Sequence, residues 1–289
     1  MPQLEDITYS REGTIAAVRG YYAFLTSMYL DEAQVIHPPP TGWPSIVEAD
    51  PGFLRDFGKS DEVIHLLAHL PYLRSVDDSG YPRQADGAPD CELANWQDLF
   101  PPLRPMEVTR EPDAEGLRII TEGPDLATVA PPHLFALTAG HRENYIMALD
   151  TQLGIVHWEE YTCPQRIARG DARMGVDYEP DSDDDVPEGE ADWRYSAPAW
   201  TVEDFFEVLK DQFKQLHWLP ISPWTVRSAD YTELHNTKGL TKMLQDIYRQ
   251  HGWPDLAVYN KAECLKAVQK AVQKAVAENY PDSACYRSR

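Results

Sequence analysis

Apolar residues recur at helical spacing in several segments near the two ends of the chain. In residues 14–30, Ile15, Val18, Tyr22 and Leu25 fall on one face, and the prolines at 38–40 forbid a long continuation of the helix. The same pattern predicts further amphipathic helices over residues 60–70, 201–216, 240–251 and 261–278.

The middle of the chain follows a different pattern. Residues 77–115 are rich in Pro, Gly and Asp and predict a long irregular excursion with one short helix near Trp96. Short apolar runs then predict strands over residues 117–121, 134–138, 145–150 and 154–159. The three residues 151–153 have a length typical of a hairpin. We therefore expect an α+β fold in a single domain, residues 1–289, with a central antiparallel β-meander packed against amphipathic helices from both ends.

The net charge of the chain limits the kinds of molecule that it is expected to bind. The chain carries 26 Lys and Arg against 47 Asp and Glu, a formal net charge of −21. Such a balance argues against general DNA or RNA binding and against docking on anionic membranes. Residues 174–193 contain no Lys and nine of the acids. We expect this run to form a solvated acidic loop.

The four cysteines, Cys91, Cys163, Cys264 and Cys285, are widely spaced and form no CxxC motif. This usage is typical of a reducing compartment. The first residues contain acids and no apolar signal core, and the apolar runs are too short to span a membrane. A cytoplasmic location is therefore expected.

The strand candidate that ends near residue 160 holds the strongest candidate site. Alternation places His157 and Glu159 on one face and Trp158 and Glu160 on the other. A buried carboxylate must be paired, protonated or directed at a cation, and nearby aromatic rings would help it to hold a guanidinium or ammonium group. A glutamate at the solvent end of the strand is the alternative. The candidate catalytic residues are His157, Glu159, Glu160 and Cys163, and the candidate substrate-binding residues here are Asp150 and Trp158.

Thiol chemistry has weaker support. A reactive thiolate needs an electropositive setting, whereas Cys163 and Cys91 both lie beside carboxylates. Free cysteines of this kind are usually small buried apolar residues.

The last predicted helix carries a row of lysines that departs from the overall charge. Lys261, Lys266, Lys270 and Lys274 lie within fourteen residues. A segregated patch of this kind can bind phosphates despite an unfavourable net charge, so Lys266, Lys270 and Lys274 are further candidates for substrate binding. A solvated helix face is the alternative.

Metal-binding patterns are incomplete. His65 and His69 lie four residues apart on one helix face, with Glu62 or His37 as a conceivable third ligand, but Leu66 stands where HExxH requires glutamate. The spacing of Asp181, Asp183 and Asp185 resembles half a calcium loop, but Val186 replaces its glycine. Motifs of serine hydrolases, P-loops and dinucleotide folds are absent from the sequence. We expect no metal and no cofactor.

The chain contains the five strings HPPPTGWPSI, GKSDEVIHLLAHLPYL, LDTQLGIVHWEEY, PAWTVEDFFEVLKDQF and DIYRQHGWPDL. Together these strings resemble a widespread family of fungal proteins that we associate with arginine-containing cyclodipeptide synthases. The resemblance spans roughly residues 13–278. It implies an enzyme of secondary metabolism that joins two aminoacyl groups carried on tRNA into a diketopiperazine. The lysine row would then contact aminoacyl-tRNA. No catalytic residue is carried over from the family.

A second resemblance belongs to a different class. The sequence places a strand hairpin, FALTAG…YIMALDTQLGIVHW, before a loop and the helix PAWTVEDFFEVL. This order is similar to that of the SUKH superfamily. The resemblance implies a noncatalytic protein-binding module. The early glycine-rich turn of that superfamily is not evident here. Segments rich in Trp, Tyr and His, together with long loops around one sheet, favour the enzyme.

Overall fold

The computed structural model describes residues 2–77, 82–100, 113–139, 145–159, 175–176, 198–229 and 238–279. Its centre is a four-stranded antiparallel sheet in the order β5-β6-β7-β8. These strands are β5 (Leu134–Ala136), β6 (Ile146–Asp150), β7 (Ile155–Glu159) and β8 (Ala199–Thr201). The sheet and the helices around it confirm the predicted α+β meander.

The longer helices largely match the amphipathic segments predicted from the sequence. They are α1 (Arg11–Met28), α4 (Asp61–His69), α6 (Ala114–Val129), α9 (Val202–Lys214), α10 (Leu240–Gln250) and α11 (Lys261–Asn279). Caps fix several of their first turns, since the side chains of Ser10, Ser60 and Thr201 accept backbone N–H groups at the starts of α1, α4 and α9.

Shorter elements join these parts. The short helices are η1 (Leu4–Asp6), η2 (Glu32–Gln34), α2 (Pro44–Val47), α3 (Pro51–Phe57) and α5 (Trp96–Leu99). Three antiparallel pairs accompany them: β1 (Val35–Ile36) with β2 (Tyr72–Leu73), β3 (Val76–Asp77) with β4 (Pro82–Arg83), and β9 (Trp218–Pro220) with β10 (Val226–Ser228). The short helix expected near Trp96 is therefore confirmed.

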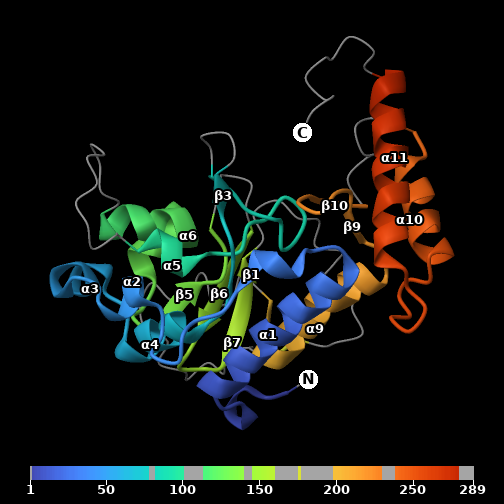
Figure 1. The fold of residues 1–289 in the computed structure, drawn as a ribbon. Coiled ribbons are helices and arrows are strands. Elements are labelled where there is room, and N and C mark those ends of the chain that lie inside the picture. The colour runs from blue at the N-terminus through green and yellow to red at the C-terminus, as the bar shows by residue number, and fades with distance from the viewer. Residues whose placement is uncertain are drawn as a thin grey trace.

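Figure 1 shows α1 and α9 side by side, with α2 to α6 gathered on one side of the molecule and α10 with α11 on the opposite side. Aromatic rings join α1 to α9, as in the contact of Tyr21 with Phe206 at 5.4 Å between centroids. The main hydrophobic core includes Val156 and Trp158, whereas Ile155 belongs to a smaller cluster on the other face of the sheet. The alternation predicted for β7 is thus confirmed.

One predicted strand is wrong. Residues 117–121 lie in α6, which begins after Asp113 accepts the Gly116 N–H at 2.6 Å. Leu117 and Thr121, four residues apart, are buried, while the intervening Ile119 and Ile120 are exposed. The cap and the helical burial pattern therefore outweigh the β-preference of the isoleucines. Strand β8, which completes the sheet, was not predicted.

Several sequence predictions lie outside the described residues. Apart from residues 175–176, the acidic loop 174–193 lies outside the described residues, as do residues 78–81 and 101–112 of the excursion. Glu160 and Cys163 fall in the same category. Their predicted structures and roles stay predictions.

Candidate functional site

The candidate residues of β7 lie in the central sheet. His157 is 1% exposed and stands between Ala148 and Ala199 in the strand register. Trp158 is buried on the opposite face, where its ring contacts Trp200 and other aromatic side chains. Glu159 is the last residue of β7. The structure thus gives Trp158 a packing role, and catalytic roles for His157 and Glu159 stay predictions.

Asp150 closes the β6–β7 hairpin. Its side chain is fully buried, and Oδ1 accepts the N–H groups of Gln152 at 2.7 Å and Leu153 at 2.8 Å. His133 Nε2 lies 3.6 Å from the other carboxylate oxygen. These contacts are those of a turn-forming aspartate. They account for the placement of Asp150 without a substrate.

The lysine row divides into two parts. Lys266, Lys270 and Lys274 are exposed along α11, whereas Lys261 Nζ donates to the carbonyls of Thr26 at 2.7 Å and Leu30 at 2.6 Å. Lys261 therefore stabilises the C-terminal end of α1, and burial lowers its pKa. Figure 1 places α11 at one flank, apart from the central strand β7. The two sets of predicted site residues do not come together.

A cleft of about 390 Å³ lies between α1, the proline segment and α4. Its volume falls within the range typical of small-molecule sites. The residues that line it are Arg11, Glu12, Ile15, Arg19, Pro38, Pro39, Pro40, His65 and His69. Two of the strings that carry the family resemblance, HPPPTGWPSI and GKSDEVIHLLAHLPYL, therefore meet in this cleft.

Helical spacing explains the arrangement of the cationic side chains. Arg11, Ile15 and Arg19 follow one another at intervals of four and so share a face of α1. Ile15 is buried, while Arg19 is exposed. His65 and His69 share a face of α4 in the same way, because its apolar residues turn towards the core. Two amphipathic helices thus direct their polar edges towards one cleft.

Arg11 is anchored at the edge of the cleft. Its Nε donates to Glu62 Oε1 at 2.8 Å, and its NH2 group contacts the second carboxylate oxygen. This paired contact holds the pKa of Glu62 below its usual value. Burial and the neighbouring Glu62 raise the pKa of Tyr9 beside them. Glu62 is therefore committed to Arg11.

The two histidines form a stacked pair. Their rings lie 4.4 Å apart between centroids and are inclined by 11°. His69 Nδ1 lies 2.8 Å from the carbonyl oxygen of His65, so this nitrogen carries the hydrogen and Nε2 is the acceptor of the neutral ring. Partial desolvation of the exposed His65 ring, the charge of Arg11 and the neighbouring His69 lower the pKa of His65. At neutral pH His65 is therefore a base that can accept a proton.

The cleft does not assemble a metal site. Across the described residues, no three His, Cys, Asp or Glu side chains gather in a way that could hold a metal ion. Glu62, one of the two third ligands considered from the sequence, binds Arg11 instead. The cleft is better suited to proton transfer and to binding an anion.

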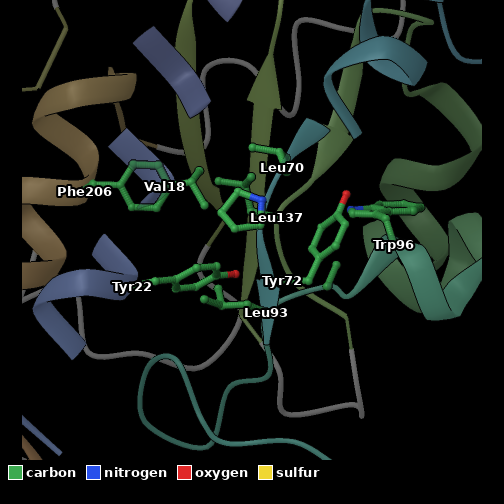
Figure 2. Close-up of a pocket in the computed structure, with 10 residues that line it drawn as sticks. Val18, Tyr22, Leu70, Tyr72, Leu93, Trp96, Leu137 and Phe206 are labelled. Atoms are coloured by element: carbon green, nitrogen blue, oxygen red, sulfur yellow. The ribbon is translucent and has the colours of Figure 1, made fainter. Parts of the chain in front are cut away.

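An internal cavity of about 20 Å³ lies among apolar side chains that include Val18, Tyr22, Leu93 and Phe206 (Figure 2). This is room for about one water molecule, and a buried water needs two or more polar partners. The lining is almost wholly apolar. We therefore interpret this cavity as a packing void rather than a ligand site.

The described cysteines are not poised for nucleophilic chemistry. Cys91 and Cys264 are both buried. Burial raises the pKa of Cys91 well above its usual value and that of Cys264 to about 11. Neither thiol therefore forms an appreciable thiolate at neutral pH.

Arg11, Arg19 and the contact of Glu62 with Arg11 were not predicted from the sequence. The repeat of Arg11, Ile15 and Arg19 at intervals of four was a visible signal for a cationic helix face. The partner surface was not visible, because Arg11 and Glu62 are separated by 51 positions in the chain.

Comparisons of this chain with protein-family models, curated proteins and solved structures give no match. Among the described helices, none has both the length and the apolar composition needed to cross a membrane. The function is therefore argued from the cleft and from the resemblance of the sequence.

Proposed function

We propose that the chain is a biosynthetic enzyme that forms an arginine-containing cyclodipeptide from aminoacyl-tRNA, with the cleft between α1 and α4 as its active site. The observation that carries the proposal is the gathering of Arg11, Arg19, His65 and His69 in one cleft of a strongly acidic chain. The resemblance supplies the reaction, and the cleft supplies groups able to perform it.

The reaction requires positioning and proton transfer. The amine of one aminoacyl group attacks the ester carbonyl of the second, an amide bond forms, and the ester bond to the tRNA breaks. The proton lost by the amine passes to a base and then to the departing tRNA hydroxyl. A second attack of the same kind closes the ring and releases the other tRNA. No redox step or cofactor enters this sequence.

Residues of the cleft suit these steps. The ring of the stacked His65–His69 pair that stays neutral is the group we assign to accept and return the proton. Arg19 is exposed at the cleft and is assigned to the negative charge of the tRNA end or of the tetrahedral intermediate. His157, Glu159, Glu160 and Cys163 stay predictions for further catalytic roles.

The exposed lysines of α11 are assigned to the tRNA body. Lys266, Lys270 and Lys274 recur at intervals of four and lie on one helix face. They would contact successive phosphates of the acceptor stem, so binding should weaken with salt by a log–log slope of about −2 to −3. Their contribution is to affinity rather than to the chemical step.

The proposal is tested by product formation. The wild-type chain is expressed in a bacterial host, and the medium is analysed by mass spectrometry for an arginine-containing diketopiperazine. A purified reaction with charged tRNA, with and without RNase, establishes the donor. Formation of the product only with intact tRNA supports the proposal. Absence of product in both settings overturns it, and recovery of a stoichiometric protein partner by an inactive chain would favour the protein-binding alternative.

Matched variants locate the site. Arg19→Ala should lower product formation by about 20-fold or more, as expected for loss of a charge-stabilising donor. Arg55→Ala removes an exposed arginine of α3 outside the cleft and should change the rate by less than about twofold. Equal rates of product formation in the two variants would contradict the assignment of the cleft as the active site.

A further inference from the structure

We propose that the cleft binds the phosphodiester at the 3′ end of tRNA and that the His65–His69 pair takes up one proton when the phosphate binds. This inference rests on the proposed function for the identity of the tRNA end. Its physical basis is the charge balance and the stacking geometry of the cleft.

The charges of the cleft cancel while the histidines are neutral. Arg11 is neutralised by its paired contact with Glu62. Arg19 is accompanied by Glu12, which lines the same cleft. The formal sum over these four groups is zero, so an anion entering the cleft meets donors but no net positive charge. A proton on the imidazole pair supplies the missing charge.

The stacked rings limit uptake to one proton. With 4.4 Å between the ring centroids, two protonated imidazoles would repel each other strongly. One imidazolium beside one neutral ring avoids this repulsion. A phosphodiester carries a single negative charge, so the charge of a singly protonated pair matches it.

The surroundings of His65 leave this proton unbound in the free protein. Arg11 and Tyr9 approach the Glu62 carboxylate from the N-terminal side, and His69 stacks on the His65 ring within α4. Partial desolvation, Arg11 and His69 lower the pKa of His65, while Glu62 opposes them more weakly. A bound phosphate opposes these effects, because it adds a negative charge beside the stacked rings.

Hydrogen-bond directions agree with a protonated ring as a donor. The Nδ1 hydrogen of His69 is used by the His65 carbonyl, which leaves Nε2 as the atom that can gain a proton. An imidazolium Nε2–H donates to a phosphate oxygen in a charge-assisted bond. Arg19 supplies guanidinium donors from the opposite helix. Side chains of both α1 and α4 thus donate hydrogen bonds to the phosphate oxygens.

The test uses cytidylyl-adenosine, which carries one phosphodiester, and inorganic phosphate as separate probes. Binding is measured by calorimetry at pH 7 in two buffers of different ionisation enthalpy, with chloride holding the ionic strength constant. We expect uptake of close to one proton with cytidylyl-adenosine. Between pH 8 and 7, its affinity should rise by up to about tenfold, as linkage of one proton requires.

Single substitutions test which residues account for the proton uptake. His65→Asn and His69→Asn should each lower the proton uptake and flatten the pH dependence of affinity. His251→Asn is the matched control, since His251 Nδ1 lies 2.8 Å from the Ile247 carbonyl, as His69 Nδ1 lies from that of His65. Its binding and proton uptake should equal those of the wild type. Arg19→Ala should weaken binding of cytidylyl-adenosine by about tenfold or more.

The outcomes separate this inference from the proposed function. Binding of cytidylyl-adenosine without proton uptake, no binding at all, or binding of inorganic phosphate alone would each overturn the inference, even in a chain that makes the diketopiperazine. Proton-coupled binding of cytidylyl-adenosine that is weakened about tenfold or more in Arg19→Ala supports it. If that same chain makes no diketopiperazine, the phosphate site stands and the proposed reaction falls.

Discussion

Two ion pairs of this protein lie in opposite settings. Lys59 Nζ lies 2.5 Å from Glu122 Oε1, and the two side chains are 1% and 0% exposed. Arg11 binds Glu62 with side chains that are 33% and 34% exposed. The first pair is sealed in the protein, whereas the second borders an open cleft. The comparison predicts that burial, rather than the presence of a charge pair, decides how much stability is lost when one partner is removed.

The buried pair coincides with a break in α6. Gly123, directly after Glu122, has φ of +75°, and Pro124 follows it. This positive φ requires glycine, and an added Cβ would also come 2.8 Å from Ile146 Cδ1. Burial lowers the pKa of Lys59 and raises that of Glu122. Each group therefore depends on the other to remain charged.

The largest expected effect is loss of the buried pair. Lys59→Met should lower the free energy of unfolding by about 3 to 5 kcal/mol, because it leaves Glu122 without its cation. Urea denaturation near neutral pH measures the loss. The double variant Lys59→Met with Glu122→Leu should recover most of it, since neither side chain is then charged. A loss in the single variant below about 1 kcal/mol would contradict the assigned role.

The partly buried carboxylate of Asp86 extends the comparison, because its hydrogen-bond partner is a backbone N–H instead of a lysine. Asp86 Oδ2 accepts the Val226 N–H at 2.9 Å, and burial raises the pKa of Asp86 to about 7. The raised folded-state pKa means that stability is greatest at low pH and is lost as pH rises from about 4 to about 7.

Asp86→Asn should remove this pH dependence, because asparagine keeps an acceptor for Val226 and does not ionise. In the wild type, ionisation of Asp86 should lower the free energy of unfolding by at most about 4 kcal/mol between pH 4 and pH 7, and this loss should be absent in the variant. Denaturation midpoints measured from pH 4 to pH 8 test it. An unchanged slope in the variant would show that Asp86 does not titrate in this range.

Helices were predicted correctly where a short stretch of sequence carries enough information to define them. The apolar stripes of α1, α4 and α9 and the caps at Ser60 and Thr201 are properties of short windows of sequence. Strand β8 was missed because it has only three residues, of which Thr201 is also the cap of α9. Its identity comes from pairing with β7, which is a long-range contact.

The candidate site was less predictable for the same reason. The His65–His69 spacing was visible, and so was the alternation that places Trp158 and His157 on opposite faces of the sheet. The concavity that joins the histidines to Arg19 depends on how α1, the prolines and α4 are arranged. No local pattern encodes that arrangement.

Loss of the partly exposed Arg11–Glu62 pair should have a small effect on stability and a clear effect on the pKa of His65. Arg11→Met should cost about 0.5 to 1 kcal/mol, since exposed ion pairs contribute little. The pKa of His65 should rise in this variant, because Arg11 lowers it and the freed Glu62 raises it. NMR titration of the His65 ring tests the direction. A lowered pKa would contradict the proposed electrostatics of the cleft.

The smallest effect is expected for a pair on the surface of α11. Lys274 Nζ lies 3.8 Å from Glu278, and the side chains are 74% and 64% exposed. Lys274→Ala should change stability by no more than about 0.3 kcal/mol, since water screens the pair and alanine favours the helix. Urea denaturation of Lys274→Ala, Arg11→Met and Lys59→Met under one condition tests the whole series. If the losses do not increase in that order, burial does not set the strength of these ion pairs, and the distinction between the sealed pair and the cleft pair fails.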